Sequence, residues 1–176
     1  AAATGPFGAP LRVEAGLGLP PSGGALPRVP AEGALSGRVT WSGQVGEVWA
    51  LVPGADHLLE GRLDVDLALS GTVATPEIGG DLALSGGHYE NLTTGTILTD
   101  LTVDSTIAPD GDLALDLRAR DGGEGRVSAE VALAGDRLEA RLETREAVLV
   151  RRDDVTAALA IDLTAEGPLT GPDLAG

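Results

Sequence analysis

The sequence predicts an all-β protein, and three observations support this prediction. Apolar and polar residues alternate with a period of two in at least five segments, which is the pattern of strands with one apolar face and one wet face. Short clusters of Gly, Pro, Asp and Ser separate these segments, as turns do. No stretch has the 3.6-residue apolar period of a useful amphipathic helix.

The N-terminal segment, residues 1–32, differs from the remainder of the chain. It is rich in Gly, Ala and Pro, and the breakers Pro20, Pro27 and Pro30 interrupt any longer element. We therefore expect at most one short strand there, around Leu11 to Leu17.

From Gly33 onward the alternation becomes regular. The clearest segments lie at 63–70, 112–118, 126–133, 137–143 and 159–164, and turn residues at 52–54, 85–87, 109–111, 121–123 and 135–136 mark the breaks. The stretch from Val45 to Leu59 is ambiguous, because Trp49 to Leu51 is compatible with an extended strand and Asp56 to Leu59 with one helical turn.

An internal repeat appears when the chain is shifted against itself by 96 residues. The segment 63–67 (LDVDL) falls on 159–163 (LAIDL), and Gly71, Pro76 and Gly80 then meet Gly167, Pro172 and Gly176. We therefore divide the chain into the N-terminal segment 1–32, one repeat unit at 33–158 and the start of the next unit at 159–176. A repeat unit needs neighbours to bury its apolar face, so we expect a fragment of a longer repeat protein.

The composition excludes several classes of protein. With 12 Arg, no Lys and 27 Asp and Glu, the net charge of −15 argues against a nucleic-acid-binding protein and against binding to an anionic membrane surface. No window approaches 18 uncharged apolar residues, the length of a membrane-spanning helix. The absence of Cys excludes disulfides, thiolate metal sites and cysteine nucleophiles.

The sequence offers no convincing catalytic or metal site. His57 and His88 lie in turn-like contexts without a Gly-x-Ser-x-Gly motif, so we interpret them as solvated loop histidines. The pairs Asp110/Asp112 and Asp64/Asp66 are better interpreted as a turn and as the wet face of a strand than as calcium ligands. We therefore predict a protein that is not an enzyme and that has no cofactor and no metal.

The remaining candidate for function is the apolar face itself, which must be buried in a sandwich or against a ligand. A β-sandwich is the common solution. However, only four residues are aromatic, although hydrophobic residues make up 43% of the chain, and bulky aromatics normally supply much of a packed core. This shortage and the repeat favour an extended curled sheet, a U-shaped trough with an apolar concave face.

A resemblance to a known family supports the trough. The pattern Gly37-x-Val39-x-Trp41-x-Gly43, followed by Trp49, and the stretch 79–101 (GGDLALSGGHYENLTTGTILTDL) resemble the C-terminal region of the TamB family. TamB proteins are the translocation and assembly module subunits among the AsmA-like, bridge-type lipid transfer proteins of diderm bacteria. The resemblance covers about Gly33 to Gly176.

This resemblance implies a function. It implies a periplasmic segment of a protein anchored in the inner membrane, folded as a "β-taco", which carries phospholipid between the inner and outer membranes. It also implies a link to outer-membrane protein assembly through the barrel protein TamA. The partners would be phospholipid acyl chains and TamA, with no nucleic acid, and membrane contact would be made only by parts of the parent protein outside this fragment.

By the same resemblance, the aliphatic side chains of the alternating strands would line the lipid groove. These residues are Leu63, Val65, Leu67, Leu69, Leu82, Leu84, Leu101, Val103, Leu113, Leu115, Leu117, Val127, Val131, Leu133, Leu138, Leu142, Leu159, Ile161 and Leu163.

The alternative is a structural β-repeat, a sandwich or solenoid of a secreted adhesin-like protein with no ligand. Repeats of that kind tend to be rich in Thr and Asn, whereas Asn occurs once here. A sealed sandwich would carry no co-purified lipid, and this distinguishes the two hypotheses.

Overall fold

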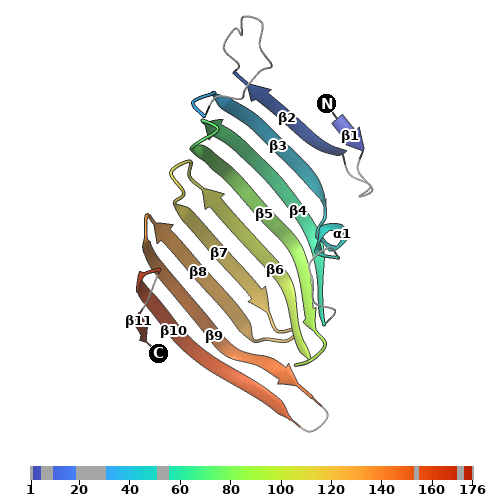
Figure 1. The fold of residues 1–176 in the computed structure, drawn as a ribbon. Helices are drawn as coiled ribbons and strands as arrows, with labels where there is room; N and C mark the ends of the chain where they lie inside the picture. The colour runs from blue at the N-terminus through green and yellow to red at the C-terminus, as the bar shows by residue number, and fades with distance from the viewer. Residues whose placement is uncertain are drawn as a thin grey trace, which may run out of the picture.

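A computed structural model describes residues 2–4, 10–18, 31–50, 56–152, 155–169 and 173–175. It confirms the all-β prediction: the described residues form eleven strands and one short helix (Figure 1). The elements are β1 (Ala2–Thr4), β2 (Pro10–Leu17), β3 (Leu35–Gln44), α1 (Val45–Trp49), β4 (His57–Gly71), β5 (Pro76–Asn91), β6 (Thr96–Ile107), β7 (Leu113–Arg120), β8 (Arg126–Ala134), β9 (Arg137–Arg151), β10 (Thr156–Pro168) and β11 (Asp173–Ala175).

The strands form one extended, open antiparallel sheet. Their order in space, β1 to β11, is their order along the chain, so each strand pairs with its sequence neighbours. β1 and β11 lie at opposite ends of the sheet and do not pair with each other (Figure 1). The sheet is therefore a curved meander that is not closed.

The pairing register places the apolar residues of successive strands on the same side of the sheet. Directly paired residues share a face, and Val65 pairs with Leu82 just as Leu115 pairs with Val131. This side, which carries the apolar residues from β2 to β10, is called the apolar face here. The opposite side carries most Asp, Glu and Arg side chains of the strands and is called the polar face.

A diagonal line of irregularities bends the sheet. Register shifts occur between Glu60 and Arg62 in β4, between Leu84 and Gly87 in β5, between Thr99 and Thr102 in β6, and next to Leu159 in β10. Gly61, Gly86, Asp100 and Glu146 at these places have positive φ. β-bulges bend strands and increase their twist. The shifts lie at β4 to β6 and again at β9–β10, and the line that joins them is called the crease here.

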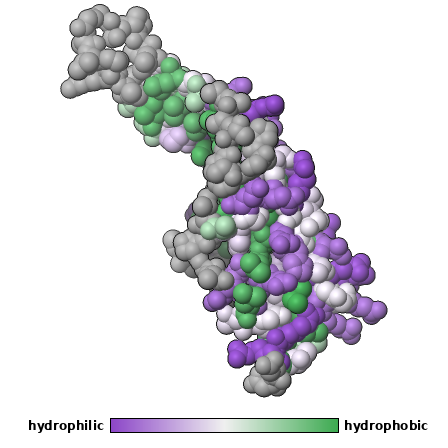
Figure 2. Space-filling model, turned by 90° about the vertical axis from the view of Figure 1, so that its right-hand side faces the viewer, coloured by the Kyte–Doolittle hydropathy of each residue, from purple (hydrophilic) through white to green (hydrophobic). Residues whose placement is uncertain are grey.

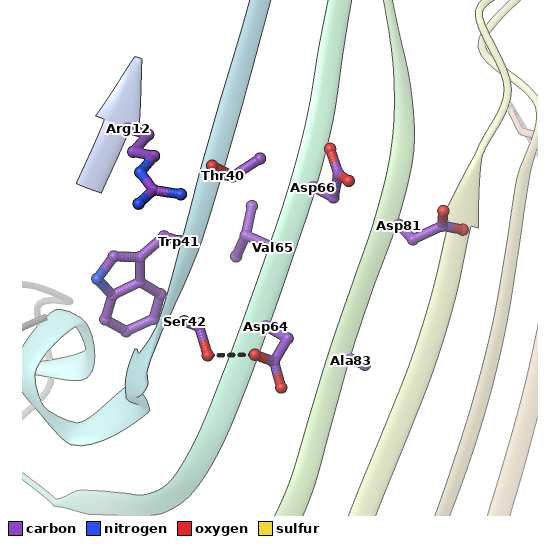
Figure 3. A pocket seen from close by; sticks show the side chains of 9 residues that line it. All are labelled: Arg12, Thr40, Trp41, Ser42, Asp64, Val65, Asp66, Asp81 and Ala83. Atoms are coloured by element: carbon purple, nitrogen blue, oxygen red, sulfur yellow. Dashed lines mark hydrogen bonds between the residues drawn. The ribbon is translucent and has the colours of Figure 1, made fainter. Parts of the chain in front are cut away.

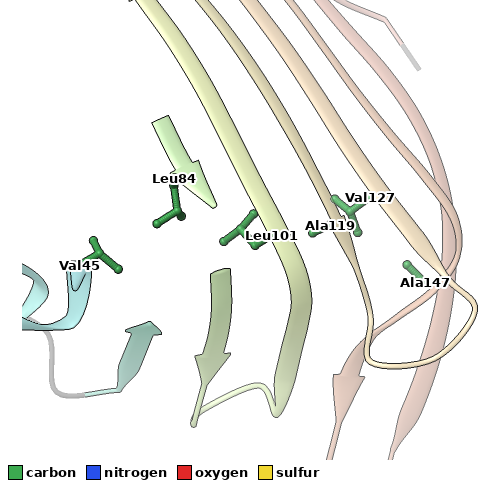
Figure 4. Close-up of a cluster of buried hydrophobic side chains, with 6 residues drawn as sticks. All are labelled: Val45, Leu84, Leu101, Ala119, Val127 and Ala147. Atoms are coloured by element: carbon green, nitrogen blue, oxygen red, sulfur yellow. The ribbon is translucent and has the colours of Figure 1, made fainter. Parts of the chain in front are cut away.

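The tightest packing of the apolar face lies along this crease. Figure 4 shows the cluster, whose members are 0–8% exposed: Val45, Leu84, Leu101, Ala119, Val127 and Ala147. Gly87 also lies there, and a Cβ at this position would come within 2.8 Å of Leu101. The low exposure of these side chains makes the crease the best-packed part of the apolar face.

Away from the crease, the apolar face is only partly covered. No large side chain of the described residues is fully buried, and Ile78 is 51% exposed. The accessible surface of the chain is 11287 Å², whereas a compact monomer of 17.7 kDa exposes about 8,000 Å². Among the described residues, one sheet is present and no second layer covers its apolar face.

A buried carboxylate fastens the β7–β8 hairpin at the crease. Asp121 is 3% exposed, and its Oδ1 accepts hydrogen bonds from the N–H groups of Gly123 (2.8 Å) and Gly125 (3.1 Å). Its Oδ2 accepts one from the N–H of Val148 in β9 (2.8 Å) and lies 3.7 Å from the guanidinium of Arg151. The hairpin tip is therefore tied to β9.

Beyond this tip, β6 and β9 approach each other directly. Thr96 Oγ1 donates to the carbonyl of Leu149 (2.5 Å), and the N–H of Arg151 donates to the carbonyl of Thr94 (3.0 Å). The tip of the short β7–β8 hairpin is thus enclosed between β6 and β9.

The 96-residue sequence repeat has a counterpart in the register of the sheet. Leu69 pairs with Ile78 across β4 and β5, and Ala165 pairs with Leu174, 96 residues later, across β10 and β11. The two copies differ before these pairs. A helix, α1, lies between β3 and β4, whereas no helix lies between β9 and β10 among the described residues.

Three predictions for local structure are wrong. The break expected at 85–87 lies inside β5, where a bulge takes the place of a turn. The helical turn is at Val45–Trp49 and not at Asp56–Leu59, which belongs mainly to β4; Leu51 lies outside the described residues. Val45 is apolar and 6% exposed, and burial of its side chain stabilises α1 at this position. The N-terminal segment contains β1 in addition to β2, because Ala2–Thr4 pairs along the edge of β2.

Candidate functional site

The apolar face is the candidate functional site. The structure places all nineteen predicted groove-lining residues on this one face, in strands β4 to β10. Direct pairs such as Leu63–Leu84, Leu113–Leu133 and Leu142–Leu163 connect them from strand to strand. What this arrangement provides is a continuous aliphatic surface that crosses seven strands. Contact of the nineteen residues with lipid stays a prediction.

Further apolar residues extend the face, and the list predicted from sequence did not include them. Val39 pairs with Val13 and Leu67, and Trp41, which is 8% exposed, pairs with Val65. The alternation of Val39 and Trp41 with polar neighbours in the sequence could have identified them. Leu149 lies beyond a bulge that changes the alternation, so the period of two alone could not have placed it.

The exposure of the apolar face differs between the crease and the rest of the sheet. Leu84 and Leu101 at the crease are 7% and 5% exposed, whereas Leu142 and Leu163 are each 37% exposed. In the side view of Figure 2, apolar side chains form a band and strongly hydrophilic side chains gather along one flank of the molecule. The apolar face can therefore contact an apolar ligand mainly away from the crease.

The polar face has the opposite chemistry. Figure 3 shows a hollow on it, lined by Asp64 and Asp66 of β4, Asp81 of β5 and neighbouring residues of β3. Asp64 accepts a hydrogen bond from Ser42, and Arg38 forms two hydrogen bonds with Asp66, of 2.8 and 2.5 Å. The two hydrogen bonds from Arg38 hold the pKa of the exposed Asp66 carboxyl below its ordinary value.

The two histidines are not in loops, and the prediction of solvated loop histidines is wrong. His57 lies in β4 and His88 in β5, and both are half-buried. His57 Nδ1 lies 2.6 Å from the Tyr89 hydroxyl, and His88 Nε2 lies 2.7 Å from Glu90 Oε1. The paired strand ends order both rings, which the turn-like sequence context did not indicate.

The predicted turn and wet-face carboxylates lie where these interpretations expect them. Asp110 accepts a hydrogen bond from the N–H of Asp112 (3.3 Å) in the turn after β6. Asp64 and Asp66 lie on the polar face of β4. Within the part of the chain that the structure describes, no group of three or more His, Asp or Glu side chains is arranged to hold a metal ion.

The described residues contain one helix, α1. α1 has five residues, and no helix among the described residues has the length and apolar character needed to cross a membrane.

Comparisons of this chain with protein-family models, with curated proteins and with solved structures give no match.

Proposed function

We propose that this chain is a segment of a hydrophobic conduit that carries phospholipid, with acyl chains on the apolar face and headgroups toward water. The observation that supports this proposal is the continuous aliphatic surface from β4 to β10, which is covered by no second layer among the described residues. The resemblance to the TamB family adds the lipid, the periplasm of a diderm bacterium and TamA to the proposal.

The physical basis of transport is desolvation. Each methylene kept out of water is worth about 0.8 kcal/mol, so a lipid with two long acyl chains loses tens of kcal/mol on crossing water unaided. A surface that offers apolar contact at every step removes most of this barrier, and it needs no catalytic residue.

The side chains of the open part of the apolar face suit a conduit. Leu115, Val131 and Leu142 are flexible or small aliphatic groups in adjacent strands, without an aromatic ring between them to create a discrete pocket. A lipid can therefore move between equivalent positions, since no single position binds it much more tightly than the next.

Lipid contact can be tested by photocrosslinking. A photoreactive residue replaces Val131, which lies directly opposite Leu115 on the apolar face, and a second variant carries it at Ser128 on the polar face. The chain is purified from a diderm bacterium and irradiated. We expect phospholipid adducts from position 131 and none from position 128. Absence of adducts from both positions would contradict the proposal.

A charge on the apolar face gives the second test. Leu115→Arg places a guanidinium beside position 131, and Ala114→Arg adds the same charge on the polar face of the same strand. On an open face the long side chain reaches water, so we expect both variants to fold and only Leu115→Arg to abolish lipid adducts.

The structural alternative predicts a different result. If a partner layer seals the apolar face as the core of an adhesin-like repeat, Leu115→Arg buries an unpaired charge and unfolds the assembly, and no lipid co-purifies with the unmodified chain. Thermal unfolding and native mass spectrometry of the same samples distinguish the two functions.

A further inference from the structure

Three arginines lie side by side on the polar face, at the end of β7, at the start of β8 and in the middle of β9. Arg120 pairs directly with Arg126, and Arg126 pairs directly with Arg145. Adjacent strands are about 4.8 Å apart, and like charges directly opposite each other destabilise a sheet. A row of three cations across three neighbouring strands therefore requires an explanation, particularly in a chain of net charge −15.

The surroundings of this row differ from those of the other hollows on the polar face. The row borders a hollow of about 340 Å³, lined by four arginines (Arg118 and the row) and two carboxylates (Asp100 and Glu143). In three other hollows on this face carboxylates outnumber arginines: by three to one around Arg12, by five to one around Arg141 and by two to one around Arg38. Among these four hollows, the hollow beside the arginine row is the one with an excess of positive charge.

Intramolecular ion pairs do not fully satisfy the row. Arg120 Nε lies 3.7 Å from Asp100 Oδ2, and Arg145 Nε lies 2.6 Å from Glu143 Oε1. Arg118, next to the row, contacts Asp116 at 3.1 Å. Arg126, the central member, is exposed and forms no hydrogen bond or ion pair with the residues that the structure describes. Its guanidinium donors are available to an external acceptor.

We propose that the row Arg120–Arg126–Arg145 binds an oxyanion of the phosphate type, as a phosphate or diphosphate group of a small molecule or of a lipid headgroup. Guanidinium groups donate two parallel hydrogen bonds to such oxygens, and the fork geometry makes Arg better suited to this than Lys. Three groups that together span about 10 Å match one phosphate or two linked phosphates better than an extended polyanion.

The site is independent of the proposed lipid path. Its side chains lie on the polar face, whereas Ala119 and Val127, the sequence neighbours of Arg120 and Arg126, are buried on the apolar face. The loss of one activity therefore does not entail the loss of the other.

The test uses two chain variants that remove the same charge from the same face. Arg126→Gln removes the central arginine of the row, and Arg12→Gln removes an exposed arginine from the acidic hollow bordered by Asp64 and Asp66. Sodium pyrophosphate is titrated into each protein by calorimetry, with ionic strength held constant by chloride. We expect pyrophosphate to bind the unmodified chain and Arg12→Gln equally, and Arg126→Gln at least about tenfold more weakly.

A second arm identifies the source of the oxyanion. Phosphatidylcholine vesicles with and without phosphatidic acid are mixed with the same three proteins in a flotation assay. Binding that requires both phosphatidic acid and Arg126 assigns the row to a lipid headgroup, whereas binding of pyrophosphate alone assigns it to a soluble phosphate. If neither probe binds, or if Arg12→Gln weakens binding as much as Arg126→Gln does, the proposal is wrong. Arg145→Gln repeats the test should Arg126→Gln fail to fold.

Discussion

The apolar face is one surface, but its side chains have different surroundings at the crease and in the open part around Leu115, Leu142 and Leu163. At the crease, Leu101 is 5% exposed and packs against side chains from neighbouring strands. In the open part, Leu142 and Leu163 pair directly and are each 37% exposed. The residue type and the alternation are the same in both regions, so the difference comes from the backbone.

The backbone difference is the line of bulges. Leu142 and Leu163 lie where β9 and β10 pair regularly, and they stay exposed. At Gly61, Gly86 and Asp100, an additional or displaced residue bends the strands, and the apolar side chains of the crease are buried. In a single-layer sheet, alternation produces an apolar face, and the bulges determine how much of it is buried.

The largest effect expected from this comparison is on stability. Leu101→Ala at the crease removes a buried side chain and leaves a cavity, so it should lower the free energy of unfolding by about 2–4 kcal/mol. Leu115→Ala in the open part should cost less than half as much. Urea denaturation of both variants measures the difference, and equal losses would show that the two regions pack alike.

A somewhat smaller effect is expected at the carboxylate that fastens the crease. Asp121→Asn removes the acceptor for the N–H of Val148 and the charge beside Arg151, which should cost about 1–3 kcal/mol. Hydrogen exchange should show faster opening of the β7–β8 hairpin tip than in the unmodified chain. Protection unchanged at Gly125 and Val148 would contradict this role.

The same carboxylate predicts a pH dependence. The hydrogen bond from Val148, with those from Gly123 and Gly125 and the charge of Arg151, lowers the pKa of Asp121, although burial opposes the shift. A lowered folded-state pKa means that the stabilisation is fully present above the unfolded value of about 3.9 and is lost as pH falls through the folded value. The stability difference between the unmodified chain and Asp121→Asn should therefore shrink on acidification below about pH 4, as paired urea titrations would show.

The smallest effect is expected on the polar face, on the side of the sheet opposite Leu142 and Leu163. Arg141 Nη2 lies 3.0 Å from Asp162 Oδ2, with both side chains more than half exposed. Exposed ion pairs contribute little, so Arg141→Ser should change the free energy of unfolding by less than about 0.5 kcal/mol. A loss of several kcal/mol would show that the two faces have been assigned the wrong way round.

Much of the fold could be predicted from the sequence, because the alternation directly encodes which residues share a face. Leu63 to Leu69 and Leu113 to Leu117 required no further information. The bulges could not be predicted in the same way. Gly86-Gly87 looks like a turn, yet it lies inside the 16-residue strand β5, since Leu101 of the neighbouring strand needs the space beside Gly87.

Some residues of the candidate sites could not be predicted from the sequence, because bulges and strand register place them. Tyr89 and Leu149 face the crease because a bulge in their own strand shifts the alternation. The arginine row also escaped prediction, because Arg120, Arg126 and Arg145 are dispersed along the chain and only the register of three strands places them opposite one another.

The meander topology has a consequence for how the chain acquires its structure. Strands that are neighbours along the chain are neighbours in the sheet, so each new strand pairs with the strand that precedes it. Such a chain can fold in the order of its synthesis, each new strand adding to an edge that already exists, without waiting for a distant partner. The contacts of Thr94 and Thr96 with Arg151 and Leu149 are the exception, because they form only after the β7–β8 hairpin is in place. We expect this closure to be slower than the pairing of neighbouring strands.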